Sequence, residues 1–215
     1  MIMKKLSLQI LVFAIALGVF TQSSIEHANA NDENEPRKAI GLKAGFYSPS
    51  FSFFDQSLWN FSNPTPFGLE FDYHINRFLF IKTGVDFYSS EAEVIRPELE
   101  WQEKIEFEFI PVHFSLLAKY DFEYVEAFAG PGLEFISIAT TYTSPNRTEF
   151  KSGYTSVFTI NAGVERRFGD FVLSLHSKYT LGEFRQRMNV GSNLQRNNEI
   201  SLNGLQIGTT VKYLF

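Results

Sequence analysis

The chain ends on Leu205-Gln206-Ile207-Gly208-Thr209-Thr210-Val211-Lys212-Tyr213-Leu214-Phe215. One face of this stretch carries the odd-numbered residues, which are mostly apolar and end in two aromatics. The other face is polar apart from Leu214. Alternation at period two indicates a β-strand with two unlike faces. The apolar face suits either the core of a soluble sandwich or the lipid side of a bacterial outer-membrane barrel, where Tyr213 and Phe215 would join an aromatic girdle.

Seven earlier stretches show the same alternation and raise the predicted strand count to eight. They are residues 39–47, 67–75, 79–87, about 104–120, 124–136, 158–165 and 171–179. Only Asn76-Arg77 separates the second from the third, which indicates a hairpin. Pro111 cannot donate to a strand ladder, so we expect a bulge or a position near the rim there. Gly130-Pro131-Gly132 predicts a kink in the fifth strand.

The connections between these strands alternate in length. Long connections cover residues 48–65, 89–104, 140–153 and 182–198, and short ones lie between them. Outer-membrane barrels have an even number of strands, short periplasmic turns and longer extracellular loops. The sequence therefore predicts an all-β fold: an eight-stranded antiparallel up-and-down transmembrane β-barrel with four long extracellular loops.

The face opposite the apolar one carries charges of both signs in nearly equal number. The positions are Lys43, Lys82, Lys119, Lys178, Lys212, Glu70, Asp72, Asp86, Glu126, Glu134 and Glu165. A soluble core would not hold them, because a buried charge costs several kcal/mol unless it is paired. Inside a narrow barrel they can pair, and eight strands leave just enough room for side chains to fill the interior. We expect no general diffusion pore. A soluble periplasmic lipocalin-like carrier is the alternative.

The N-terminus has the composition of an export signal. Lys4 and Lys5 precede an apolar run from Leu6 to Phe20, and Ala28-Asn29-Ala30 offers a cleavage site. The run is shorter than the ~20 residues of a membrane-spanning helix. We expect a cleaved signal peptide at 1–30, a disordered lead-in at 31–38 and a barrel domain at 39–215, placed in the bacterial outer membrane. The 215-residue chain has a net charge of −5, which argues against nucleic-acid partners, and no cysteine for a lipid anchor or disulfide.

Several short motifs resemble the outer-membrane β-barrel domain family, in particular the eight-stranded OmpA/OmpX-like barrels and the PorT-type group. The motifs are Gly41-Leu42-Lys43-Ala44-Gly45, Phe109-Ile110-Pro111-Val112, Lys119-Tyr120, Gly130-Pro131-Gly132 and Tyr213-Leu214-Phe215. The resemblance covers nearly the whole mature chain and implies a location and a fold. Members of such families serve as structural anchors, adhesins or secretion-system parts, and no catalytic residue is implied.

One motif admits an enzymatic interpretation. His113 and Ser115 share one face of a predicted strand, as in the His-x-Ser of lipid A deacylase barrels, and Glu126 is the nearest acid of the right parity on the next strand. Such a triad would make Ser115 a nucleophile activated by a base. The parity turns all three inward, away from acyl chains, so interior hydrogen bonding is the favoured role. His74 and His176 show no ligand spacing, and we expect neither metal nor cofactor.

The predicted loops carry the candidate binding residues. An aromatic group (Phe53, Phe54, Trp59, Phe61) either caps the barrel mouth or forms an adhesive surface. Arg185, Arg187 and Arg196 would either pair with the acidic second loop or engage lipopolysaccharide phosphates. We therefore expect a monomeric, non-enzymatic barrel that meets outer-membrane lipid, lipopolysaccharide and, through its loops, a protein partner or host surface. A lipid hydrolase is the alternative from another class.

Overall fold

The structure, a computed structural model, describes residues 38–49, 62–96, 101–189 and 195–215. These residues form ten strands: β1 (Lys38–Pro49), β2 (Phe67–His74), β3 (Leu79–Arg96), β4 (Trp101–Asp121), β5 (Glu126–Ser144), β6 (Arg147–Phe168), β7 (Phe171–Leu181), β8 (Glu183–Asn189), β9 (Gln195–Ser201) and β10 (Gly204–Leu214). Among them there is no helix with the length and apolar character of a membrane span.

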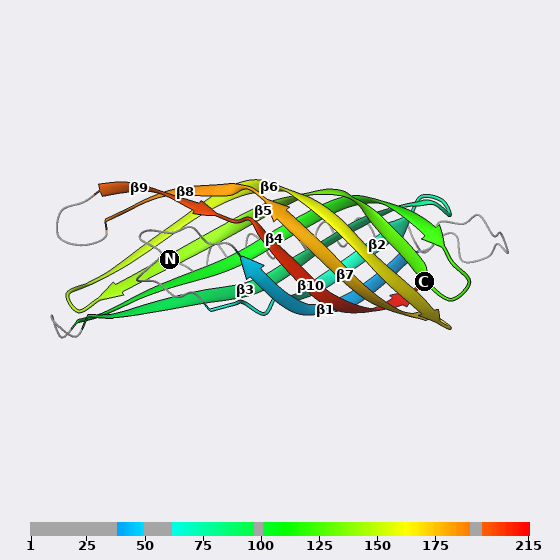
Figure 1. Cartoon of the computed structure of the whole chain (residues 1–215), viewed down its shortest axis with the longest axis horizontal. Coiled ribbons are helices and arrows are strands. Elements are labelled where there is room, and N and C mark those ends of the chain that lie inside the picture. The colour runs from blue at the N-terminus through cyan, green and yellow to red at the C-terminus, as the bar shows by residue number, and fades with distance from the viewer. Residues whose placement is uncertain (1–37, 50–61, 97–100, 190–194) are drawn as a thin grey trace. The chain divides into compact units, whose positions relative to one another are not determined.

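Eight of the strands close a barrel in the order β1-β10-β7-β6-β5-β4-β3-β2, and β8 and β9 form a separate two-stranded sheet (Figure 1). Every pairing in the barrel is antiparallel, and β10 closes the ring by pairing with both β7 and β1. The backbone of Phe215 bonds to Lys38, so the two termini of the barrel lie at the same end. The predicted eight-stranded antiparallel barrel is confirmed.

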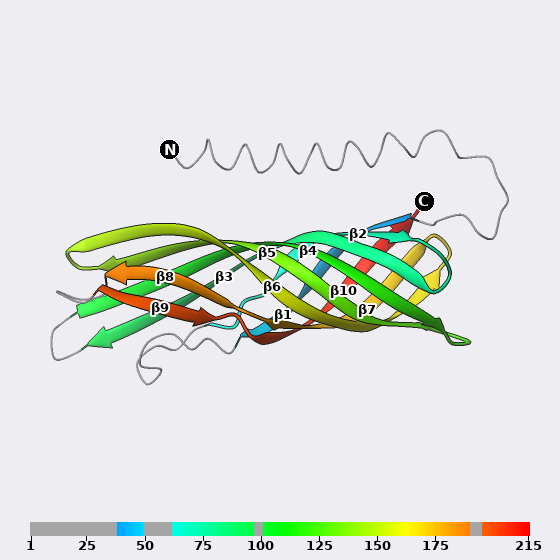
Figure 2. The same ribbon diagram turned by 90° about the horizontal axis from the view of Figure 1, so that it is seen from above.

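The predicted long loops are wrong for two of the four connections. Most of residues 89–104 and 140–153 is paired strand, because β3 and β4 continue to a connection at 97–100, and β5 and β6 continue to a turn at 145–146. The connection at 182–198 contains β8 and most of its partner β9. Figures 1 and 2 show these three hairpins running on past the ends of β1, β7 and β10. Together we call residues 88–96, 101–109, 136–144, 147–157 and the β8–β9 hairpin the outer extension.

Neither Pro111 in β4 nor Pro131 in β5 shifts the register of its strand. Pairing of β3 with β4 stops after Val85↔Val112 and resumes at Tyr88↔Phe109 with the same offset, so the ladder is interrupted at Pro111 without a bulge. Pro131 pairs with Ile160 in an unbroken β5–β6 ladder, but the β4–β5 ladder stops at Ser115↔Gly132 and resumes at Ala118↔Ala129 with the same offset. Of the two outcomes expected at Pro111, a bulge or a position near the rim, the bulge is wrong. An interrupted ladder is the simpler consequence of a residue that has no N–H to donate.

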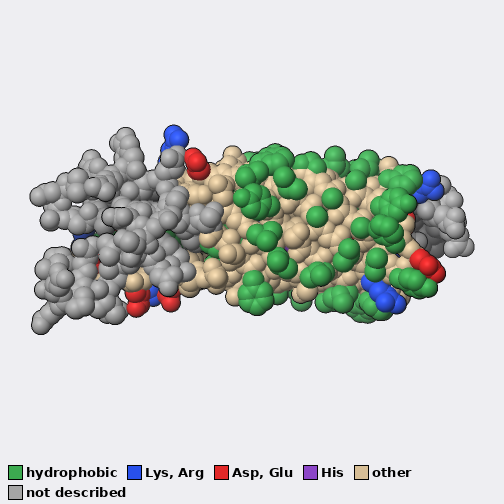
Figure 3. Space-filling model, in the orientation of Figure 1, with side chains coloured by type: hydrophobic (Ala, Val, Ile, Leu, Met, Phe, Trp, Pro, Cys, Tyr) green, Lys and Arg blue, Asp and Glu red, His purple; other side chains and the backbone are tan. Residues whose placement is uncertain are grey.

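The barrel wall is apolar outside and polar inside, as the membrane interpretation requires. Leu173 and Ile207 are 49% and 50% exposed on the outer surface, whereas Ser174 and Lys212 are buried inside. Figure 3 shows hydrophobic side chains over the visible face of the barrel, toward the end at which Figure 1 marks the C-terminus. Aromatic rings mark both edges of this band, with Phe67 stacked on Phe87 at one edge and Phe171 against Tyr213 at the other.

The interior has three layers. Phe80, Leu117 and Phe128 form a small apolar cluster at the end of the barrel where the termini lie. Paired charges fill the middle. A larger apolar cluster fills the outer extension; its members are Ala92, Ile105, Phe107, Phe109, Ile136, Ile138, Tyr142, Val157, Phe184, Ile200 and Leu202, with Tyr88 packed against them.

Candidate functional site

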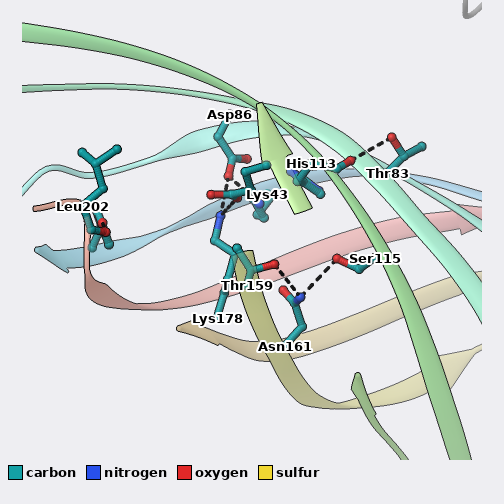
Figure 4. A network of polar contacts seen from close by, with 11 residues as sticks. Lys43, Thr83, Asp86, His113, Ser115, Thr159, Asn161, Lys178 and Leu202 are labelled. Carbon is teal, nitrogen blue, oxygen red and sulfur yellow. Dashed lines mark hydrogen bonds and ion pairs between the residues drawn. The ribbon is translucent and has the colours of Figure 1, made fainter. Parts of the chain in front are cut away.

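The middle layer is organised around two lysines that each contact more than one carboxylate. Lys178 of β7 lies 3.5 Å from the Asp86 carboxylate of β3 and forms a close ion pair with Glu134 of β5. Lys43 of β1 donates to the same Asp86 oxygen at 2.7 Å. Figure 4 shows Lys43, Asp86 and Lys178 together with His113 inside the barrel. Four strands therefore meet through this one cluster.

Lys212 of β10 is the second centre. Its ammonium lies 2.5 Å from Asp72, 3.0 Å from Glu165 and 3.5 Å from Glu70. Lys82 extends the network through a 3.0 Å contact with Glu70. All of these side chains are buried, so each ammonium offsets the large desolvation cost of the carboxylates it contacts. The expectation that interior charges pair with one another is met by these residues.

His113 and Ser115 both point into the barrel, as their parity predicted, but each belongs to a different set of contacts. The ring of His113 lies against Gly84 of β3, where an added Cβ would come within 2.7 Å of its Cε1 atom. Its backbone carbonyl accepts a hydrogen bond from Thr83 Oγ1 at 2.9 Å. Ser115 Oγ accepts one from Asn161 Nδ2 at 3.1 Å (Figure 4).

Glu126 is not brought to His113 and Ser115. The register places Glu134, not Glu126, opposite His113, so the expected nearest acid of the triad was wrong. Glu126 pairs with Asp121 at the start of β5, eight residues before Glu134, which puts the two acids about 26 Å apart along the strand at ~3.3 Å per residue. There its carboxylate accepts a hydrogen bond from Lys119 at 2.8 Å. The alternation along the strand predicted correctly that His113 and Ser115 face the interior. The acid opposite His113 can be identified only from the register between β4 and β5.

Three donor side chains converge where a metal ion could in principle bind. Ligand atoms of Asp86, His113 and Glu134 lie within 4.8 Å of one another, a combination that sequence spacing did not reveal because three strands supply it. Asp86 and Glu134, however, already contact the ammonium groups of Lys43 and Lys178. A divalent ion there would face two fixed positive charges, so the arrangement suits an ion-pair cluster better than a metal site. His176 lies outside this group, against Gly208, and His74 stacks on Phe80.

The outer extension reverses the polarity of the membrane wall. On β4, Ile105, Phe107 and Phe109 point inward, whereas Lys104, Glu106 and Glu108 point outward. Outward positions on β3 at this level are also acidic, with Glu91 opposite Glu106 in the ladder. Lys104 contacts Glu91 at 2.6 Å, and this hydrogen bond raises the pKa of Lys104 above its usual range. The extension is therefore built like a water-soluble domain.

The candidate surface residues fall partly outside the described residues. Phe53, Phe54, Trp59 and Phe61 lie outside them altogether, as do the side chains of Arg187 and Arg196. Arg185 of β8 is exposed, and its backbone pairs with Glu199 of β9. Sequence reasoning missed the apolar core of the extension. Its signal was the alternation of Ile105, Phe107 and Phe109 with charged residues, at the start of the strand predicted from about residue 104, where the apolar side chains lie on the face opposite to that of Ile110 and Val112.

Comparison with known proteins agrees with this architecture. The family described as outer membrane protein beta-barrel domain matches residues 12–215. OprG from Pseudomonas aeruginosa superposes with a TM-score of 0.66 and 13% identity, over 87% of this chain and 99% of OprG. Neisserial surface protein A gives a TM-score of 0.48 and 12% identity, over 86% and 100% of the two chains.

Ail of Yersinia pestis, solved with the heparin analogue sucrose octasulfate, gives a TM-score of 0.45 and 14% identity, over 85% of this chain and 100% of Ail. No curated protein matches the chain. At 13% identity the likeness to OprG shows a shared fold and nothing finer. The family match over most of the chain, the closed eight-stranded barrel and the apolar outer band lead to one conclusion: the chain belongs to the family of outer membrane protein β-barrel domains.

Proposed function

We propose that this protein is a non-enzymatic outer-membrane barrel that presents its outer extension to lipopolysaccharide or to a partner at the cell surface. The observation that carries the proposal is the reversed polarity of the extension. Inward Phe107 and Phe109 give it a core, and outward Glu106 and Glu108 suit it to water. A folded, cored platform on the side away from the short turns fits presentation of a surface better than loose loops would.

The layered interior supports a role other than general diffusion. The Phe80 cluster, the paired lysines and the large apolar cluster follow one another along the barrel, and the middle and outer layers are each contributed by several strands. A solute would have to displace all three layers. The exposed apolar band, together with interior charges, argues against the soluble lipocalin-like carrier.

The hydrolase alternative has little support in this geometry. Ser115 accepts from Asn161, His113 faces Glu134 and Gly84, and Glu126 lies at the far end of β5. We expect lipid A acylation in cells carrying His113→Ala to equal that in wild-type cells, measured by mass spectrometry of extracted lipid A. A changed acylation profile would instead support the lipid hydrolase.

Lipopolysaccharide is the partner that location and surface chemistry favour. Guanidinium groups suit phosphate recognition, and Arg185, Arg187 and Arg196 belong to the hairpin of the outer extension. We also propose that residues 1–30 are a cleaved signal peptide and that residues 31–38 are a disordered lead-in. The barrel domain from residue 39 is then a monomer. Partners at a host surface would use the same extension.

Binding of diphosphorylated lipid A tests the phosphate part of this proposal. The triple variant Arg185→Gln, Arg187→Gln and Arg196→Gln should bind immobilised lipid A about tenfold more weakly than wild type, since charged contacts to phosphate are removed. Lys104→Gln is the matched control, because it removes an exposed cation from another wall of the extension. Equal binding by the triple variant and wild type would overturn the role of the arginines.

A further inference from the structure

The outward face of the β5–β6 hairpin differs from the β3–β4 wall of the outer extension. Two exposed aromatic side chains lie on β6, with Phe150 53% and Tyr154 71% exposed. Ser152 and Ser156 are their neighbours on the same face of the strand, and the adjacent β5 contributes Ser137, Ala139, Thr141 and Thr143. These outward positions carry no charge, whereas the β3–β4 wall carries Glu91, Glu93, Glu106 and Glu108. We call residues 137–143 and 150–156 on this side the β5–β6 face.

The β5–β6 face continues the lipid-facing surface beyond the membrane. On β6 the outward series runs from Ile160 and Phe158 in the apolar band to Tyr154 and then Phe150. The short turns and the termini mark the periplasmic end, so Phe150 lies on the extracellular side of the band. The layer directly above the hydrocarbon of that leaflet consists of the sugars of lipopolysaccharide. Continuity with the membrane surface therefore brings this face against saccharide.

The chemistry of the face fits a saccharide chain. Phe150 and Tyr154 are four residues apart on one strand, or about 13 Å at ~3.3 Å per residue, which spans a few sugar rings. The electron-rich faces of aromatic rings attract the C–H groups of a pyranose, and hydroxyl side chains between them can exchange hydrogen bonds with sugar hydroxyls. Two large rings that are half exposed or more contribute less stability to the fold than buried rings would, because much of their apolar area stays in contact with water.

We propose that the β5–β6 face binds the core saccharide of lipopolysaccharide, with Phe150 and Tyr154 stacking on sugar rings. This deepens the proposed function and rests on it. The acidic β3–β4 wall repels the phosphates of the same lipid, so charge directs the saccharide to the uncharged face. Phosphate contacts and sugar contacts then come from different parts of the extension.

Core oligosaccharide released from lipopolysaccharide, free of lipid A, tests this proposal by surface plasmon resonance on protein held in nanodiscs. Wild type should bind it, and the double variant Phe150→Ala and Tyr154→Ala should bind about tenfold more weakly, which corresponds to ~1.4 kcal/mol. Tyr154→Phe, which keeps the ring, should stay within about twofold of wild type. Glu106→Gln is the control at the same level, because Thr141 pairs with both Glu106 and Phe150.

The two proposals fail separately. No binding of oligosaccharide by wild type, or equal binding by the double variant, overturns the saccharide face whatever lipid A does. Loss of binding in Glu106→Gln to the same degree as in the double variant also overturns it. Unchanged lipid A binding in the arginine variant overturns only the phosphate contacts. Heat-dependent gel mobility of each variant confirms that its barrel is folded before binding is measured.

Discussion

Single residues hold the barrel together from inside. Lys178 is the clearest case, because its one ammonium group contacts Asp86 of β3 and Glu134 of β5 while its backbone belongs to β7. An apolar side chain there would leave Glu134 buried without its cation. A buried charge that loses its partner costs far more than the intact pair contributes.

The variant Lys178→Met should destabilise the barrel by about 3–5 kcal/mol, because it strands the Glu134 carboxylate. The folded fraction against urea, read from gel mobility without boiling, measures this. The double variant Lys178→Met and Glu134→Leu should recover much of the loss, since the unpaired charge goes too. Lys104→Met, which breaks an exposed pair with Glu91, is the control. If Lys178→Met unfolded at the same midpoint urea concentration as wild type, the ion pair between Lys178 and Glu134 would not be needed for stability.

At the scale of elements, the membrane barrel and the outer extension follow opposite rules on the same strands. Along β4 the outward series changes from Lys104, Glu106 and Glu108 to Ile110 and Val112, while the inward series changes from Phe107 to His113. The strand itself continues through this change. Backbone hydrogen bonding keeps the strand continuous. Whether lipid or water surrounds the barrel determines which face of the strand is apolar.

Phe107→Ala should loosen the extension and leave the membrane barrel intact. Removing a fully buried Phe costs about 3–5 kcal/mol, and here the cost falls on the extension's own core. Limited proteolysis of protein in vesicles should show new cleavage in the extension, while the remaining barrel keeps its heat-dependent mobility. Phe150→Ala, an outward position on the neighbouring hairpin, should keep wild-type resistance. Equal cleavage of the two variants would mean that Phe107 supports no separate core.

The strands and their inward faces could be predicted from the sequence, but the strand ends and the pairing partners could not. Period-two alternation located the eight barrel strands and the inward side of His113, Lys178 and Lys212, because each needs only the local pattern. Strand ends were missed in the extension, since the alternation continues there with its faces exchanged. The partner of His113 could not be read either. Register depends on the neighbouring strand, and Glu134 and Glu126 have the same parity.

At the scale of the whole molecule, the three interior layers predict a barrel that does not conduct. Ion flow would require passage through the Phe80 cluster, the Lys178 and Lys212 pairs and the Phe107 cluster in turn. Planar bilayers containing the purified protein should stay at the baseline current, with a trimeric porin as positive control. Stable, regular single-channel steps at neutral pH would contradict the sealed interior.

The wall formed by β4 faces lipid over part of its height and water above it. The chain has no cysteine, so single cysteines can be placed at even positions of β4 from Lys104 to Tyr120 and labelled with a nitroxide. In bilayers, labels at 110, 112, 114 and 116 should be relaxed by oxygen, which concentrates in lipid. Labels at 104, 106 and 108 should instead be relaxed by a water-soluble nickel complex. Labels at 110 to 116 that are shielded from both reagents would place these side chains in a protein core and contradict the account.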